Sequence, residues 1–465
     1  MLKEYQKCAK EMLEFIEKSP TCFQAVANLE EALEEKGFSK LREKDSWELE
    51  RGRGYFVTRN GSSLIAFRIP GGREEAAVQE DSREEGDDAG RAASPDEKGA
   101  SGREGLRRGG VKGFHISAAH SDSPSFKIKE SPEMAVEDAY LKLNTEKYGG
   151  MILSSWLDRP LSVAGRVAIR GRGGVETRLV NVEKDLLVIP SLAIHMTRDK
   201  AAGGEYNPQT DMLPLYAECG GKKKDVLMKR VAKAAGVKPE EILGHDLFLY
   251  TREKGRIVGE NGDFVMSPRL DDLQCVYAAS KAFMESEPEK YINVCAVFDN
   301  EEVGSGTKQG AGSTFLEDTL WRIGESLGLG RGDFLRMIAE SFLISADNAH
   351  AVHPNHPEKA DPTNRPYLNK GIVIKFHGGQ KYTTDALSAA KMKRICESAK
   401  VPYQTYANRS DIAGGSTLGN ISTSHVSVSS VDIGLPQLAM HSAVETAGIR
   451  DTQYAVDAFQ VFFRK

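Results

Sequence analysis

The sequence predicts an α/β fold in which a smaller β-rich domain interrupts a larger domain. Short apolar runs alternate with helical patterns, and several of these runs end in polar residues, which is where open α/β sheets place their ligands. Between about residues 126 and 257 the pattern changes to short β-like runs separated by Gly and Pro turns, which is typical of a separate small domain. We therefore expect residues 1–120 and 259–465 to form the large domain and residues 121–258 the inserted one.

The composition is that of an ordinary globular protein. The 465 residues are 40% hydrophobic and 28% charged, and the net charge of -5 argues against nucleic acid as the main partner. The six cysteines show no CxxC spacing, which is typical of reduced cytosolic thiols. The start of the chain, MLKEYQKCAKEMLEF, is charged throughout, and no apolar run approaches the ~20 residues that span a bilayer. We therefore expect a cytoplasmic protein with no membrane partner.

The first part of the chain begins with helical patterns and a hairpin. Residues 3–18 predict a helix, and a second helix is expected to end near Gly37. Two β-like runs, 55–58 and 64–69, are joined through Asn60-Gly61, which is a strong hairpin signal.

Residues 71–110 differ from the rest because they contain almost no large apolar side chain. Such a segment cannot bury enough surface to offset its ordering entropy, so we expect a disordered surface insertion. A solvated loop is favoured over a charged tether for a partner.

The inserted domain contains β-like runs, one helix and two histidines beside apolar residues. Its runs and helix are expected at 126–129, 161–169, 177–181, 186–190 and 224–235. His195 and His245 favour a structural role on their local pattern alone.

The central stretch is residues 298–306, FDNEEVGSG, which follows the apolar run Val294–Val297. Glu301 and Glu302 are adjacent, and two carboxylates are costly to bring together as anions near apolar structure. A metal would explain the pair, because one carboxylate can bind the cation while the other takes a proton from the attacking water. A solvated acidic turn is the alternative.

A second constellation follows the strand expected at 111–119, where His120 and Asp122 are two residues apart. One ring nitrogen of His120 can bind a metal while Asp122 accepts the other N–H and fixes the tautomer. A surface histidine followed by an Asp turn is the alternative.

Asp271 and Asp272 precede a helix expected at 273–285. They can cap that helix and compensate its dipole, or one of them can bridge two cations, which a neutral imidazole cannot do.

The last part of the chain contributes further candidates. Asp347 follows the buried run 342–345, and it precedes His350, His353 and His356, which can be ligands or lie over a site. The Gly-rich stretch at 408–419 lacks a nucleotide-binding motif, so nucleotide binding receives little weight.

Five candidate ligands emerge from these positions: His120, Asp271, Glu302, Asp347 and His441. Two histidines and three carboxylates suit two borderline cations such as Zn²⁺ or Co²⁺, with one carboxylate shared. Two such cations can clamp the attacking and reacting oxygens, and Glu301 would remain free as the general base.

Five motifs now stand in one order along the chain: HSDSPSFKIK at 120–129, SPRLD at 267–271, FDNEEVGS at 298–305, SADNAHAVHPNH at 345–356 and LAMHS at 438–442. With these motifs the chain resembles the M18 metallopeptidases, the aspartyl aminopeptidase family, apart from the 71–110 insertion. The resemblance implies a mixed-sheet zinc-peptidase catalytic domain with helices on both faces, interrupted by a β-rich dimerisation domain. It also implies a peptide substrate, two Zn²⁺ per subunit, with Co²⁺ or Mn²⁺ possible at one site, and a tetrahedral homododecamer built from dimers.

The same resemblance assigns roles. Asp271 would bridge the metals, His120 and Asp347 would complete one of them, and Glu302 and His441 the other. Glu301 would be the general base and then the proton donor to the leaving amine. Asp122 would orient His120, and His195 would help to stabilise the tetrahedral intermediate in a neighbouring subunit.

The sequence departs from the family pattern at two positions beside the ligands. Asp272 stands where the family often has Asn, and Asn348 stands where Met is common.

Substrate choice stays open at this point. An N-terminal Asp or Glu would need a basic pocket, for which Lys375 or Lys381 is the candidate, with His350 nearby. A lysine on a strand is also commonly a snorkelling surface residue, and some relatives prefer neutral residues such as Leu.

Two rival functions remain. A metal-dependent carboxypeptidase or deacylase would use Arg269 or Arg409 to bind a substrate carboxylate. A non-enzymatic scaffold is disfavoured because all five ligands and Glu301 are present.

Overall fold

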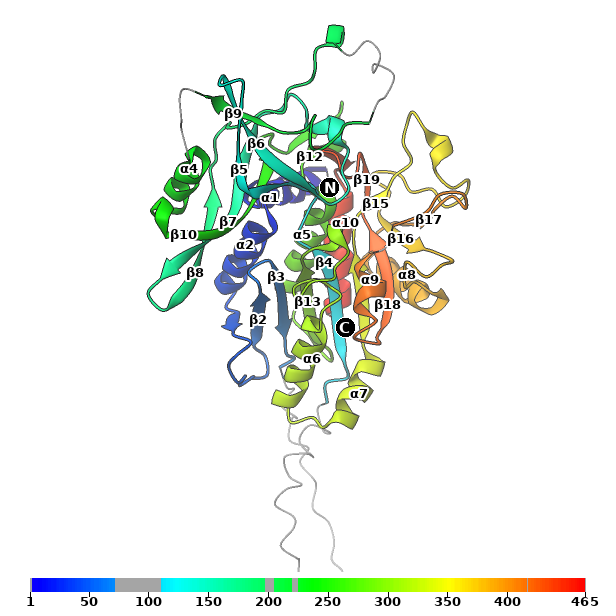
Figure 1. Cartoon of the computed structure of the whole chain (residues 1–465). Helices are drawn as coiled ribbons and strands as arrows, with labels where there is room; N and C mark the ends of the chain where they lie inside the picture. The colour runs from blue at the N-terminus through cyan, green and yellow to red at the C-terminus, as the bar shows by residue number, and fades with distance from the viewer. Residues whose placement is uncertain (1, 72–109, 197–204, 220–224, 416, 465) are drawn as a thin grey trace, which may run out of the picture.

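The computed structural model describes residues 2–71, 110–196, 205–219, 225–415 and 417–464 (Figure 1). Apart from its two end residues, the insertion predicted at 71–110 lies outside the described residues. No helix in the described ranges is long and apolar enough to cross a membrane.

A nine-stranded mixed sheet forms the centre of the molecule. In the order in which they pair, its strands are β1 (Ser39–Leu41), β2 (Gly54–Arg59), β3 (Ser63–Arg68), β13 (Ile292–Phe298), β4 (Phe114–His120), β14 (Phe342–Ala346), β18 (Ser429–Gly434), β16 (Ile372–Phe376) and β17 (Tyr403–Ala407). The four central strands β13, β4, β14 and β18 run parallel, whereas β3 and β16 pair with them antiparallel. The predicted α/β class with a mixed sheet is confirmed.

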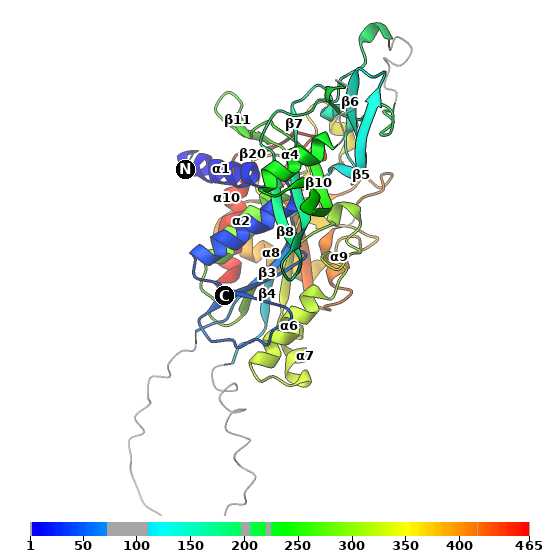
Figure 2. The same ribbon diagram turned by 60° about the vertical axis from the view of Figure 1, so that its left-hand side comes forward.

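Helices cover both faces of this sheet (Figure 2). On one face lie α1 (Leu2–Lys18), α2 (Cys22–Glu35), α5 (Leu270–Met284), α8 (Ala386–Ala399) and α10 (Asp451–Phe463). On the other face lie α6 (Phe315–Ser326), α7 (Arg331–Glu340) and α9 (Leu418–Ser422). Because the central strands are apolar on both sides, each face buries its own core, and the sheet is held rigidly between them.

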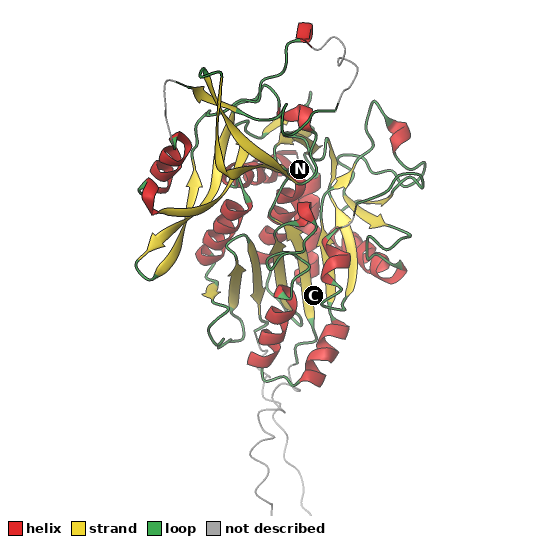
Figure 3. Cartoon of the chain, in the orientation of Figure 1, coloured by secondary structure: helices red, strands yellow, loops and turns green. Residues whose placement is uncertain are grey.

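A second, wholly antiparallel sheet of six strands lies apart from the first (Figure 3). In pairing order its strands are β8 (Gly174–Asn181), β7 (Leu161–Gly171), β10 (Ile242–Thr251), β5 (Ser125–Val136), β6 (Tyr140–Tyr148) and β9 (Leu215–Glu218). With α4 (Val226–Ala235) it encloses a third core. The prediction of a strand at 186–190 is wrong, because this run forms only isolated β-bridges, between Leu161 and Leu187 and between Val188 and Leu215.

A third sheet of five short strands was not predicted from the sequence. It contains β11 (Arg256–Val258), β12 (Phe264–Ser267), β20 (Glu445–Gly448), β19 (Pro436–Leu438) and β15 (Ala349–His350). Where the structure describes the chain, the 3₁₀ turns are η2 (Leu153–Trp156), η3 (Ile194–Met196), η4 (Pro239–Glu241), η5 (Glu301–Val303) and η6 (Pro357–Lys359). Pairing of β12 with β20 places Ser267 opposite Glu445, which joins the start of α5 to the loop before β20.

The ends of the 71–110 segment leave from the edge of the large sheet where the parallel strands begin. Arg68 at the end of β3 pairs with Asn293, and Phe114 at the start of β4 pairs with Ile292. The candidate site residues lie at the opposite edge.

Candidate metal centre

Three neighbouring parallel strands deliver polar side chains to one edge of the large sheet. His120 is the last residue of β4 and pairs with Phe298, the last residue of β13, after which Glu301 and Glu302 follow in η5. Asp347 comes directly after β14. The parallel register therefore brings together residues that are far apart in the sequence, as expected at the carboxyl ends of such strands.

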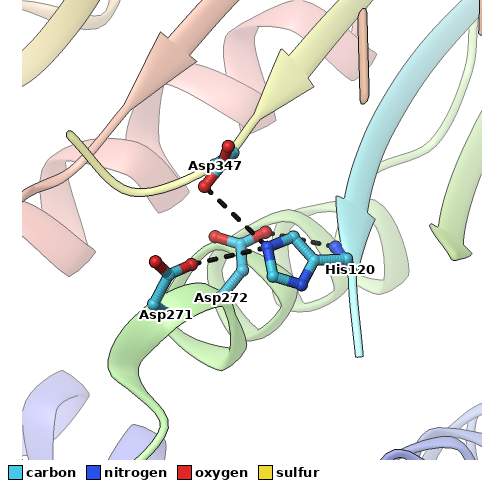
Figure 4. A group of neighbouring side chains, drawn as sticks. All are labelled: His120, Asp271, Asp272 and Asp347. Carbon is cyan, nitrogen blue, oxygen red and sulfur yellow. Dashed lines mark hydrogen bonds and ion pairs between the residues drawn. The ribbon is translucent and has the colours of Figure 1, made fainter. Parts of the chain in front are cut away.

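The first cluster surrounds His120 (Figure 4). Its Nε2 lies 3.4 Å from Asp271 Oδ1 and 3.8 Å from Asp347 Oδ1. Asp272 belongs to the same group of potential metal ligands, and its Oδ2 accepts the His120 backbone N–H at 3.1 Å. In the orientation that satisfies its neighbours, the Asn348 amide donates to Asp272 Oδ1 at 3.1 Å, so the two departures from the family pattern contact each other.

The second cluster contains Asp271, Glu302 and His441. His441 Nε2 lies 3.6 Å from Asp271 Oδ2 and 3.4 Å from Glu302 Oε2. Asp271 therefore belongs to both clusters, with one carboxylate oxygen facing His120 and the other facing His441.

The electrostatics of the clusters fit bound cations. Burial and the neighbouring Asp271 charge raise the pKa of Glu302 well above its usual range. Despite its burial, the pKa of Asp271 is lowered by the neighbouring imidazoles of His120 and His441. Within the described residues, Asp271 Oδ1 and Glu302 Oε1 are buried without a hydrogen-bond partner. Since buried polar atoms are normally satisfied, two such oxygens in clusters that contain histidines indicate ligand positions, and the donor set suits zinc.

Glu301 lies beside the first cluster, and one of its carboxylate oxygens is within 4.8 Å of ligand atoms of His120 and Glu302. Burial, with the charges of Asp347 and other nearby carboxylates, raises its pKa to about 7. A carboxylate with a pKa near neutrality is suited to accept and return a proton.

Asp122 holds the backbone that carries both glutamates. Its Oδ1 accepts the Glu301 N–H and its Oδ2 the Glu302 N–H, each at 3.2 Å. The nearest acceptor for His120 Nδ1 is the backbone carbonyl of Asp122 at 3.0 Å, whereas the carboxylate Oδ1 lies at 3.4 Å. The geometry thus adds a contact of Asp122 with the Glu301–Glu302 backbone to the expected contact with His120.

Glu445 was missed as a functional residue. It is 2% exposed, and its carboxylate accepts the backbone N–H groups of Asp271 at 3.0 Å and His441 at 2.8 Å. Burial and the Asp271 charge raise its pKa to about 8. The only signal in the sequence was a glutamate four residues after His441.

A cavity of about 310 Å³ opens beside the clusters. It is lined by Glu301, Asp347 and His441 and by Lys375, His350, Tyr382 and Tyr406. Lys375 is 3% exposed, and its Nζ lies 3.5 Å from Asp347 Oδ2. Although burial disfavours its charge, the Asp347 carboxylate raises the pKa of Lys375, which therefore stays charged.

The other basic candidates lie elsewhere. Lys381 donates to the Gly414 carbonyl at 2.6 Å and is not among the residues that line this cavity. His353 and His356 line an adjoining groove, which His350 also reaches. In the described ranges, no metal-compatible cluster includes any of these three histidines.

His195 lies in η3 on a segment that extends away from the fold at the top of Figures 1 and 2. Its neighbours Leu192, Ile194 and Met196 are 61%, 64% and 74% exposed. The structure does not bring His195 into the metal-compatible clusters of its own chain, as far as the described residues show.

Comparison with known proteins supports one family. Residues 15–79 and 107–463 match the family described as "Aminopeptidase I zinc metalloprotease (M18)". The "Probable M18 family aminopeptidase 2" of Clostridium novyi is 46% identical over 466 residues, covering 99% of this chain and 100% of the relative.

Solved structures agree with this assignment. The structure of an Ape4 and Nbr1 complex matches with a TM-score of 0.88 at 35% identity, covering 100% of this chain and 86% of that chain. The mApe1 dodecamer of S. cerevisiae matches with a TM-score of 0.79 at 26% identity, covering 99% and 97%. With the clustered histidines and carboxylates, these matches show that the chain belongs to the M18 family of zinc metalloaminopeptidases.

Proposed function

We propose that the chain removes N-terminal residues from peptides with two zinc ions, held as the clusters suggest. Asp271 would bridge the ions, with His120 and Asp347 completing one site and Glu302 and His441 the other; Co²⁺ or Mn²⁺ can replace zinc at one site. The observation that carries the proposal is the position of Asp271, whose two carboxylate oxygens face different histidines. Bound zinc ions would supply Lewis acidity that polarises the scissile carbonyl and makes water a nucleophile at neutral pH.

The protein's own residues would move the proton. Glu301 faces the first cluster and is not needed as a ligand, so it would take a proton from the attacking water and return it to the leaving amine. Asp122 would keep Glu301 in place through its backbone N–H and His120 in place through the ring.

Lys375 supports a preference for N-terminal Asp or Glu. Its charged Nζ lines the cavity beside the clusters, where a substrate carboxylate would find a cation in a site of low dielectric. Asp347 already pairs with this lysine, and Tyr382 and Tyr406 line the same cavity, so a preference for neutral residues such as Leu is the alternative.

The test is metal-dependent hydrolysis of matched Asp-, Glu-, Leu- and Lys-arylamides, with a chelator control. Faster release from Asp and Glu supports the acidic preference, and faster release from Leu or Lys overturns it while retaining the aminopeptidase. Absence of release from all four in zinc-loaded protein would overturn the aminopeptidase itself.

The positions of the two arginines weigh against a carboxypeptidase or deacylase. Arg269 donates to the Ile16 carbonyl, and Arg409 is paired with Asp411 through two nitrogens. Neither lines the cavity beside the clusters. N-acetylated peptides separate the two reactions, because an aminopeptidase fails on them and a deacylase requires them.

For assembly, we propose that residues 121–258 form a dimerisation domain and that dimers build a tetrahedral homododecamer. Yeast mApe1, whose structure is similar, is a dodecamer. The exposed apolar side chains that flank His195 support a contact of this segment with another subunit. If His195 acts across that contact, mixed oligomers of His195→Ala and Glu301→Gln subunits should recover activity that neither variant shows alone. Lack of recovery in verified mixed oligomers would refute the role of His195.

A further inference from the structure

The end of β6 leads directly into the candidate metal centre. Tyr148, the last residue of this strand, donates its hydroxyl hydrogen to Asp122 Oδ2 at 2.7 Å. The same hydroxyl oxygen accepts a hydrogen from Asn300 Nδ2 at 2.8 Å. Tyr148 therefore contacts both the carboxylate that holds the Glu301 backbone and the residue that precedes Glu301.

The residues that follow Tyr148 contact the ligands of the second cluster. Gly149 has φ of +79°, and a Cβ at this position would lie 3.1 Å from Glu302 Cβ and 3.3 Å from the Glu302 carbonyl oxygen. Contacts between carbon atoms are favourable only at ~3.5–4.0 Å, so Gly149 permits an approach that other residues would prevent. Ile152 donates its N–H to the His441 carbonyl at 3.0 Å.

Tyr148 is itself anchored in the six-stranded sheet. It pairs with Ser125 of β5, and its ring packs edge-on against Phe248 of β10, with ring centroids 5.4 Å apart. On the side of the metal centre, Asn300 adopts the left-handed conformation with φ of +64°. This conformation is uncommon for residues other than glycine, although Asn tolerates it, and the Tyr148 hydroxyl is one of the groups that hold the Asn300 side chain.

We propose that residues 148–152, which we call the β6 strap, position the general base and the ligands of the second metal. The six-stranded sheet would then take part in catalysis as well as in any subunit contact. Tyr148 would act as a positioning residue through Asp122 and Asn300, and Gly149 would set the position of Glu302. The proposal rests on the proposed function for its effect on turnover, whereas its effect on metal binding is measured separately.

The first test is Tyr148→Phe, which removes only the hydroxyl. Tyr250→Phe is the matched control, because Tyr250 lies in the same sheet, donates to Asn181 Oδ1 at 2.7 Å and accepts from Arg252 at 3.2 Å. We expect kcat to fall about 10- to 100-fold in Tyr148→Phe, since small displacements of reacting groups have effects of about this size. KM should stay within about twofold, and zinc content and Tm should match those of the control. A kcat within twofold of the Tyr250→Phe value would overturn the positioning role.

The second test is zinc binding by Gly149→Ala, with Gly236→Ala as the control. Gly236 lies outside the strap and also has a positive φ, of +68°, but a Cβ there would meet nothing within 4 Å. We expect Gly149→Ala to bind about one zinc ion fewer per chain than the control, by elemental analysis and calorimetric titration. Equal zinc content and affinity in the two variants would overturn the proposed role of Gly149. If the wild-type protein cleaves none of the arylamides, the proposed function fails, and this titration still decides whether the strap holds the ligands.

Discussion

Replacement of Glu445 by Gln should weaken zinc binding without removing a ligand. The Glu445 carboxylate accepts two backbone N–H groups, one from Asp271 and one from His441. A glutamine offers only one acceptor oxygen, so its NH₂ group would face one of these N–H groups, and a buried donor would lose its partner.

The size of the effect follows from that lost acceptor. An unsatisfied buried donor costs about 1–3 kcal/mol, which corresponds to a factor of about 5 to 150 in an equilibrium constant. Because both N–H groups belong to proposed ligand residues, we expect the cost to appear as weaker zinc binding. Replacement of a residue that supports metal ligands typically weakens metal affinity by about 10- to 100-fold, which agrees with this range.

The assay is a zinc titration against a competing chelator, with Asp451→Asn as the matched control. Asp451 is also fully buried, and it accepts the N–H groups of Asn369 at 2.7 Å and Gly371 at 2.9 Å, but it belongs to neither cluster. Both variants should lose thermal stability, and only Glu445→Gln should lose zinc affinity. Zinc affinities of the two variants within threefold of each other would refute the reasoning.

Three further predictions concern the base, the pH dependence and the specificity pocket. Glu301→Gln should keep its zinc but lose about 10²- to 10⁴-fold in kcat, measured with the preferred arylamide, and unchanged turnover would remove Glu301 from the role of base. In metal-free protein the pKa values of Glu301 and Glu445 are raised to about 7 and about 8 from a usual 4.5, so the folded state binds these protons more tightly than the unfolded state. The free energy of unfolding should therefore fall as pH rises from about 4.5 through 8. In chelator, thermal unfolding should show a lower Tm at pH 8 than at pH 6, and the difference should be smaller in zinc. A Tm that rises with pH in chelator would contradict this expectation. Lys375→Met should reduce kcat/KM for Asp-arylamide by at least about tenfold relative to Leu-arylamide, and an unchanged ratio would place the specificity elsewhere.

The sequence was most informative where burial leaves a local pattern. The apolar run Val294–Val297 and the run 342–345 were identified as strands because both faces of a central parallel strand are covered. The five-stranded sheet was missed because its strands are short, and β15, for example, has only two residues. Its pairing depends on contacts between distant segments, such as Ser267 with Glu445, which no local window contains.

The same distinction applies to the candidate site. Residues that follow strands, such as His120 and Asp347, could be selected because the ends of parallel strands meet at one edge. Glu445 could not be selected from the sequence, because its partners Asp271 and His441 become neighbours only in the fold. A buried glutamate also has no distinct local pattern. Lys375 and Lys381 looked equivalent on sequence, but the former lines the cavity and the latter is bonded to Gly414.

The edge from which the 71–110 segment leaves has a practical consequence for engineering. The family match covers 15–79 and 107–463, so residues 80–106 fall between its two parts. Residues 71 and 110 adjoin the ends of β3 and β4 that lie away from His120. The strand β4 begins at Phe114, near residue 110, and reaches the candidate metal centre only at its last residue, His120. A fluorescent protein or affinity handle spliced between these two points would be attached at the opposite edge of the sheet from the cavity. The segment thus offers a position for labelling that lies at the opposite edge of the sheet from the proposed metal ligands and leaves both chain ends free.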